Sequence, residues 1–266
     1  MTRRTSGRVP NPGVPMSKSV GITLRVAGIP VTIGPWILVG LLGLGVLSGL
    51  TAEFLAEWIV LGFIALLLHE LGHAVAFRRF GVGSSIDFWF LGGFTVPNDP
   101  EAAAGLSDRQ MLVVAVAGPG VGLVLGAATL AVGPAFRDAG SSIRMPLFLW
   151  TFVNLGWAIF NLLPISSLDG GRALGHLAGA VFGRAGRAIG LAAGLVASGL
   201  IAVLAAEARL YSVAVIAVVF GLFNPAPYSD LLDELRVGRA NLRPSEAARR
   251  LEAPTGGDLG EDPRQR

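Results

Sequence analysis

The sequence predicts an all-α polytopic membrane protein with about six transmembrane helices and a short membrane-associated β-hairpin between the second and third. Its 266 residues are 52% hydrophobic and 15% charged, whereas a soluble domain carries about 25% charged residues. The apolar residues gather in six runs whose lengths approach the span of a bilayer core of about 30 Å. The absence of cysteine excludes a disulfide-stapled scaffold and any cysteine-ligated zinc or iron–sulfur site.

The six predicted spans cover residues 33–50, 56–77, 111–134, 146–165, 187–206 and 209–224. A crossing needs about 20 apolar residues, so we expect the short first and last spans to tilt or to thin the bilayer locally. Glycines recur every four residues in the third and fifth spans, as Gly118, Gly122, Gly126, Gly186, Gly190 and Gly194. This spacing places each set on one helix face and favours close helix packing.

The basic residues indicate the orientation of the predicted spans. The formal net charge is +3, and all basic residues except Lys18 are arginine. Of the 21 basic residues, 18 lie in segments on one side of the predicted topology. By the positive-inside rule both termini face the cytoplasm. Because the charge is scattered between apolar runs, we expect no nucleic-acid partner. The bias toward arginine, alanine and glycine favours a GC-rich bacterium, and therefore the bacterial plasma membrane.

The predicted organisation has three parts. Residues 1–28 form a cytoplasmic, partly disordered arm, residues 29–225 form the six-span core, and residues 226–266 form a charged, partly disordered cytoplasmic tail. Residues 21–32 alternate weakly and predict a short interfacial strand or arm. Residues 82–97 combine aromatic and β-branched residues with glycines, which predicts a hairpin or re-entrant loop. The alternative for this segment is an interfacial belt of aromatic residues.

The second span contains His69-Glu70-Leu71-Gly72-His73. Positions i and i+4 share one helix face, so both imidazoles can bind one Zn²⁺ ion, and Glu70 can act as general base on a metal-bound water. Ionisable residues in a membrane helix cost about 2.5–3.5 kcal/mol each on insertion scales, so they are rarely accidental. The alternative is a buried His–Glu pair that only packs the bundle.

A catalytic zinc ion requires three protein ligands, and the chain offers two candidates for the third. Asp169 follows the fourth span, after Pro164, which ends or kinks that helix. The glycines at 170 and 171 permit a turn that directs the carboxylate toward the histidines. We favour Asp169 over His176, the only other histidine, and we expect His176 to lie at the surface or behind the ligands.

The motifs around these residues are similar to those of the site-2 protease family, a family of intramembrane zinc metalloproteases. They are His69-Glu70-x-x-His73, Leu91-Gly92-Gly93, Ala117-Gly118-Pro119, Asn161-Leu162-Leu163-Pro164 and Leu168-Asp169-Gly170-Gly171-Arg172. Their order is that of the family, and the resemblance covers about residues 20–225. From the lengths between and after the motifs we expect no inserted PDZ domain and no paired CBS domains. We therefore expect a minimal six-span form.

The resemblance implies His69, His73 and Asp169 as ligands of one Zn²⁺ ion, and Glu70 as catalytic acid and base. It implies Asn161 as a polar group near the scissile carbonyl or the substrate strand. It also implies a membrane-inserted β element around residues 92–93, near the substrate. The expected activity is hydrolysis of peptide bonds in or near transmembrane segments of other membrane proteins in the lipid bilayer. The sequence indicates no oligomeric state.

Two other functions are compatible with the same residues. A zinc transporter also uses intramembrane histidine and acidic residues, but the two halves of the chain show no inverted repeat. A catalytically silent relative would bind or escort membrane proteins, and it would typically have lost a ligand or the general base. Neither is lost in this sequence.

The hairpin gives a first testable prediction. The peptide bonds of a transmembrane helix are hydrogen-bonded to one another, so the substrate must unwind before it is cleaved. Pairing with the segment 88–96 would then hold the substrate extended. Proline at Phe90 or Phe94 is expected to reduce cleavage, because proline disturbs the extended backbone of the segment. Cleavage rates of the two variants beside the wild type test this, and unchanged cleavage would argue against strand pairing.

Overall fold

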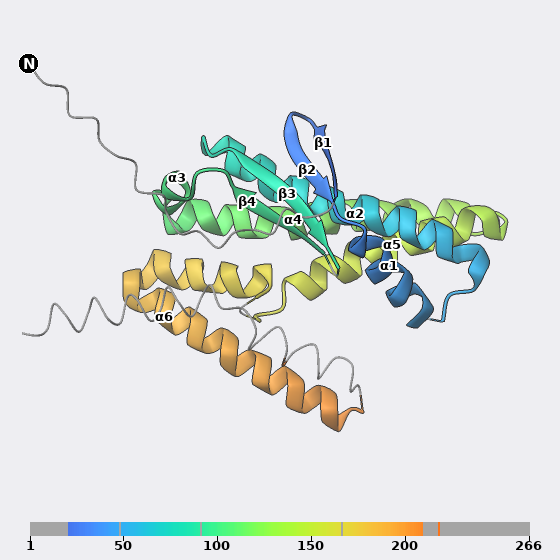
Figure 1. Ribbon diagram of the computed structural model, residues 1–266. Coiled ribbons are helices and arrows are strands. Elements are labelled where there is room, and N and C mark those ends of the chain that lie inside the picture. Colours follow the sequence, from blue (N-terminus) through green and yellow to red (C-terminus); the bar gives the residue numbers. More distant parts are fainter. Residues whose placement is uncertain (1–20, 48, 91, 166, 210–217, 219–266) are drawn as a thin grey trace, which may run out of the picture. The chain divides into compact units, whose positions relative to one another are not determined.

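The computed structural model describes residues 21–209, except 48, 91 and 166, together with residue 218 (Figure 1). The predicted arm up to residue 20, nearly all of the predicted span 209–224 and the predicted tail 226–266 lie outside the described residues. The boundaries at 28 and 225 therefore stay predictions. Residues 22–26 of the predicted arm form a strand that pairs with the following one.

The helices account for most of the described residues. They are α1 (Trp36–Leu47), α2 (Ala52–Arg79), α3 (Pro100–Ala104), α4 (Asp108–Val132) with the 3-10 turn η1 (Gly133–Phe136), α5 (Ser141–Asn161) and α6 (Asp169–Glu207). Four stretches are long and apolar enough to cross a membrane: Ala52–Arg79, Asp108–Phe136, Ser141–Asn161 and Ala188–Glu207. They coincide with the second to fifth predicted spans.

The first predicted span, 33–50, contains only a short helix. Residue 33 still belongs to a strand, and α1 has 12 residues. At 1.5 Å per residue α1 is about 18 Å long, which is less than the bilayer core. Six crossings therefore stay a prediction. The fourth predicted span, 146–165, corresponds to α5. This helix ends at Asn161 rather than at 165, because Pro164 disfavours helical geometry in the residue before it.

The predicted, mostly helical fold is confirmed, but the structure contains a four-stranded sheet where the sequence predicted a hairpin and a short strand or arm. Its strands are β1 (Ile22–Val26), β2 (Ile29–Ile33), β3 (Ser84–Trp89) and β4 (Gly92–Pro97), in the order β1-β2-β3-β4. The predicted hairpin is present as β3 and β4, which pair antiparallel, and its position relative to a membrane stays a prediction. The sheet was missed because β2 pairs parallel to β3, more than fifty residues later, and local alternation does not report such a pairing.

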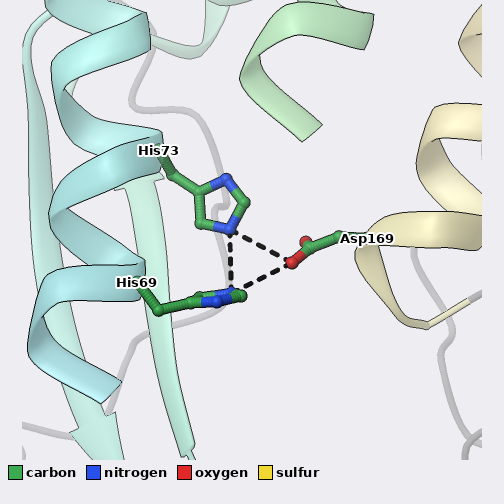
Figure 2. A group of neighbouring side chains, drawn as sticks. All are labelled: His69, His73 and Asp169. Carbon is green, nitrogen blue, oxygen red and sulfur yellow. Dashed lines mark hydrogen bonds and ion pairs between the residues drawn. The ribbon is translucent and has the colours of Figure 1, made fainter. Parts of the chain in front are cut away.

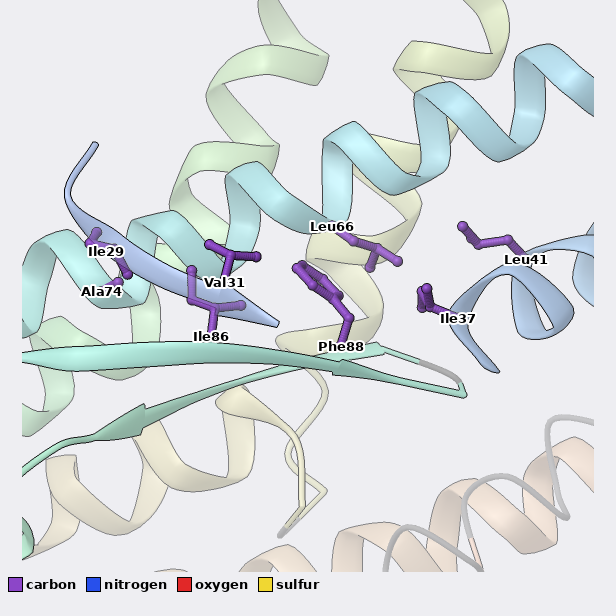
Figure 3. Packing of buried hydrophobic residues seen from close by; sticks show 8 residues of the cluster. All are labelled: Ile29, Val31, Ile37, Leu41, Leu66, Ala74, Ile86 and Phe88. Atoms are coloured by element: carbon purple, nitrogen blue, oxygen red, sulfur yellow. The ribbon is translucent and has the colours of Figure 1, made fainter. Parts of the chain in front are cut away.

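The sheet packs on α2 through one hydrophobic cluster (Figure 3). Its buried members come from the two central strands and from two helices: Ile29, Val31, Ile37, Leu41, Leu66, Ala74, Ile86 and Phe88. Burying one large aliphatic or aromatic side chain contributes about 1.5–3 kcal/mol. The chain passes from β2 through α1 and α2 to β3. The cluster therefore holds α2 against the two strands that it connects.

The predicted glycine ladders do bring helices close together. A Cβ at Gly122 of α4 would lie 2.9 Å from the backbone oxygen of Asn154 in α5. Helix α6 turns at Gly183, which has a positive φ of 63°, and its two halves fold back on each other (Figure 1). There a Cβ at Gly190 would lie 2.6 Å from the Cα of Gly175. Both contacts require glycine, because any side chain would collide with backbone atoms.

Candidate metal centre

Two histidines of α2 form one side of the centre. His69 and His73 lie one turn apart, and only 4% and 7% of their surfaces are exposed. Their Nε2 atoms are 3.2 Å apart, and their rings meet edge to face with centroids 4.9 Å apart. The helical spacing predicted from the sequence therefore brings both imidazole nitrogens to one point.

Asp169 forms the other side, a hundred residues later. It is the first residue of α6 and is 7% exposed. The next residue, Gly170, lies so close to the carbonyl group of Leu162 that a Cβ there would collide with it. Helix α6 therefore begins directly against the end of α5. The close contact between the two helix ends buries Asp169. It is possible because the residue after the aspartate is a glycine.

The three side chains converge on one point (Figure 2). Oδ2 of Asp169 lies 3.1 Å from Nε2 of His69 and 3.2 Å from Nε2 of His73. Ligand atoms of a tetrahedral zinc ion, at about 2.0–2.2 Å from the metal, lie about 3.3 Å from one another. Among the described residues this is the group of histidine and acidic side chains that could hold a metal ion. Its dimensions fit zinc.

The hydrogen-bond chemistry of the group also fits a cation. Nδ1 of His73 lies 2.7 Å from the carbonyl oxygen of Val114, to which it donates. In a neutral imidazole this bond leaves Nε2 as a lone pair that faces the carboxylate. The ionised Asp169 carboxylate can only accept hydrogen bonds, so it supplies no proton to these nitrogens. Three electron-pair donors thus face one another, and a bound metal ion would satisfy all of them.

Glu70 is buried beside the first histidine and is held by the hairpin. The hydroxyl group of Thr95 in β4 donates to the Glu70 carboxylate oxygen Oε2 at 2.7 Å, and it lies 3.0 Å from the Glu70 backbone oxygen. A Cβ at Gly93 would lie 2.5 Å from Cγ of Glu70. The carboxylate therefore lies directly against β4, and the absence of a side chain at Gly93 makes room for it.

Gly118 has a different task from the other glycines of its ladder. A Cβ at this position would collide with the imidazole ring of His73. The glycine in the Gly118-Pro119 pair therefore allows the ring of His73 to lie directly on α4, within reach of Val114. The glycine spacing predicted helix packing for Gly118, and the structure adds this contact with a metal-site histidine.

The two remaining candidates lie outside the group of three. Asn161 is buried at the end of α5, and its Nδ2 atom donates to the backbone oxygen of Trp157 at 3.0 Å. His176 lies further along α6, with Nδ1 3.0 Å from Oδ1 of Asp108 at the start of α4. The structure therefore separates His176 from His69 and His73. The role of Asn161 near a substrate stays a prediction.

Two residues of the site carried no signal in the sequence. Val114 acts through its backbone carbonyl group and Thr95 through its hydroxyl group. Neither has a side chain that marks metal or acid–base chemistry. Their contribution depends on contacts of α4 and β4 with α2, which no local pattern records.

The chain is similar to known zinc metalloproteases. The family model described as Peptidase family M50 matches residues 57–138 and 135–205, which together are more than half of the chain. The putative zinc metalloprotease Rip3 of Mycobacterium tuberculosis is 40% identical over 112 residues, which are 41% of this chain and 27% of that protein. The zinc metalloprotease MJ0392 of Methanocaldococcus jannaschii is 29% identical over 154 residues, 56% of this chain and 43% of that protein. The chain thus spans less than half the length of these curated relatives.

A solved structure shares the fold. The site-2 protease from Methanocaldococcus jannaschii superposes with a TM-score of 0.54 over 76% of this chain and 92% of that chain, at 22% sequence identity. This similarity shows the fold alone. With the four apolar helices, the family match indicates an integral membrane protein. The resemblance drawn from the motifs is confirmed: the chain belongs to Peptidase family M50.

Proposed function

We propose that this chain is an intramembrane zinc metallopeptidase that hydrolyses peptide bonds in or near transmembrane segments of other membrane proteins. One observation carries the proposal: Nε2 of His69, Nε2 of His73 and Oδ2 of Asp169 lie within 3.1–3.2 Å of one another, beside a buried glutamate. Two of these side chains and the glutamate belong to an apolar helix long enough to cross a bilayer. A zinc peptidase requires three such metal ligands, here two imidazoles and one carboxylate, and a neighbouring general base.

Each residue of the site has a separate chemical role. His69, His73 and Asp169 would hold the zinc ion, which when bound supplies a Lewis acid that polarises the scissile carbonyl group and acidifies a water molecule. Glu70 takes the proton of the attacking water and delivers it to the leaving nitrogen. Thr95 keeps the Glu70 carboxylate in one orientation through the hydrogen bond of 2.7 Å. We assign Asn161 to the substrate side of the same site, because it ends the helix that leads into Asp169.

The edge of the sheet supports an extended substrate next to Glu70. Strand β4 is at one end of the strand order, so its outer edge has no neighbouring strand among the described residues. The backbone N–H group of Asn98 donates to the oxygen of Gly83, and bonded pairs alternate along an antiparallel ladder. By this alternation the backbone groups of Gly93 and Thr95 face away from β3. A substrate segment paired with these two residues would lie directly beside Glu70.

The ligand set is tested by measuring zinc per purified chain. The wild type in detergent is expected to contain about one zinc ion, and Asp169→Ala is expected to lose most of it, because two imidazoles alone form an incomplete site. His176→Ala is the matched control and should keep the wild-type content, since His176 pairs with Asp108 instead. Zinc that persists in Asp169→Ala, or disappears in His176→Ala, would contradict the ligand set.

The catalytic role of Glu70 is tested with Glu70→Gln. The amide keeps the size of the carboxylate but cannot carry the proton, so we expect cleavage to fall by about 10²–10⁴-fold with zinc content unchanged. Release of fluorescent fragments from labelled casein, which offers extended segments, gives the rate in detergent. A membrane-anchored reporter with one transmembrane segment, co-reconstituted with the enzyme, tests the intramembrane reaction.

The same variant separates the proposal from its two alternatives. A zinc transporter would move zinc into proteoliposomes in both the wild type and Glu70→Gln, because all three ligands remain. A silent relative would bind the reporter and cleave it in neither protein. Cleavage by the wild type that is lost in the variant supports the peptidase and excludes both alternatives.

The hairpin's contribution is tested with Thr95→Val, which removes the hydroxyl group and keeps the shape. Loss of a hydrogen bond to a buried carboxylate is expected to lower the cleavage rate about tenfold or more. Zinc content should not change, because Thr95 contacts Glu70 and none of the three ligands. Thr32→Val is the control, because Thr32 forms an exposed hydrogen bond with Thr23 in the same sheet. Equal rates for the two variants would show that Thr95 does not position Glu70.

A further inference from the structure

A second concave site lies where the end of α4, the turn η1 and the start of α5 meet. It is a groove of about 720 Å³, within the usual range of small-molecule sites of about 300–1,000 Å³. The residues that matter for its chemistry are Leu130, Phe136, Arg137, Ser141, Arg144 and Phe148. None of them belongs to the metal centre, and we call this site the α4–α5 groove.

The polar side of the groove has an excess of positive charge. Arg137 and Arg144 both line it, and among the described residues their one ion-pair partner is Asp138, whose Oδ2 lies 3.9 Å from Nε of Arg137. The guanidinium group of Arg144 has no hydrogen bond or ion pair with any residue that the structure describes. An anion bound between the two guanidinium groups would supply the missing partner.

The start of α5 adds to this charge. A helix N-terminus carries a partial positive charge, which proteins usually balance with an acidic residue in the first turn or a capping side chain. Helix α5 has neither: its first turn contains no acid, and Gly140 at its cap offers no side chain. Arg144 lies in this first stretch of α5, where a basic residue is unfavourable. Helix end and arginines together therefore favour an anionic ligand.

The other side of the groove is apolar. Leu130, Phe136 and Phe148 are exposed, and they lie on stretches of α4, η1 and α5 that are apolar enough to cross a membrane. Such side chains contact acyl chains in a bilayer, whereas the arginines at the helix ends lie at the level of the headgroups. The groove thus joins a site for an anion to a wall for a hydrocarbon chain.

We propose that the α4–α5 groove binds one anionic phospholipid. The headgroup phosphate lies between Arg137, Arg144 and the first N–H groups of α5, and one acyl chain runs along Leu130 and Phe148. A free phosphate ion would leave the apolar wall unused. A zwitterionic lipid would bring a cation into a region that already carries two arginines and a positive helix end.

The test compares two lipids with the same acyl chains on the purified protein. Native mass spectrometry in detergent measures the binding of phosphatidylglycerol and of phosphatidylcholine, and the wild type is expected to prefer phosphatidylglycerol. Arg144→Gln is expected to weaken phosphatidylglycerol binding about fivefold, as is Arg137→Gln, since each basic group near a membrane surface contributes about this factor. Arg109→Gln is the control, because it removes the same charge from the opposite end of α4.

Each outcome decides the proposal. A preference for phosphatidylglycerol that falls in Arg144→Gln or Arg137→Gln but not in Arg109→Gln supports it. Phe148→Ala, which shortens the apolar wall, should then weaken both lipids. Equal binding of the two lipids by the wild type would overturn the proposal, and so would equal effects of Arg144→Gln and Arg109→Gln. Displacement of the lipid by inorganic phosphate would replace it with a free-anion site. Zinc content of every variant, expected at the wild-type value, reports that the chain is folded.

Discussion

The convergence of three electron-pair donors inside a bundle of apolar helices is the constraint on which the rest of this structure depends. Ionisable side chains in a membrane helix cost about 2.5–3.5 kcal/mol each on insertion scales. Here two imidazoles and a carboxylate lie within 3.1–3.2 Å of one another. A shared cation would satisfy all three groups at once. The elements that carry them must therefore be held in place by contacts elsewhere.

Helix α2 is held from two directions. One face carries His69 and His73, and α4 reaches this face through the carbonyl group of Val114 and the bare backbone of Gly118. The adjoining face packs on the sheet through Leu66 and Ala74. The hairpin then meets Glu70 through Thr95, so the residue assigned to proton transfer is anchored by the sheet and the metal ligands by the helices.

Helix α4 connects the metal centre with the α4–α5 groove. Val114, near its start, contacts His73, whereas Leu130, near its end, lines the groove. Sixteen residues of helix separate them, which is about 24 Å at 1.5 Å per residue. One rigid helix thus serves a site that requires dehydrated, convergent ligands at one end and a site that requires unpaired positive charge at the other. The two sites share no residue, so changes in the groove leave the ligand set intact.

The sequence by itself determined the family, the four long apolar helices and the chemically marked residues, because each is recorded locally. Helical spacing puts His69 and His73 on one face, and Pro164 with Gly170 indicates where a helix ends and the next begins. Only the tertiary structure decided that Asp169 rather than His176 contacts the histidines. Both residues lie on α6, and the position of that helix determines which of them reaches α2. It also decided the parallel pairing of β2 with β3 and the contacts of Val114, Gly93 and Thr95. These contacts join segments far apart in the chain through backbone atoms, a hydroxyl group and an absent side chain, which leave no periodicity or motif to detect.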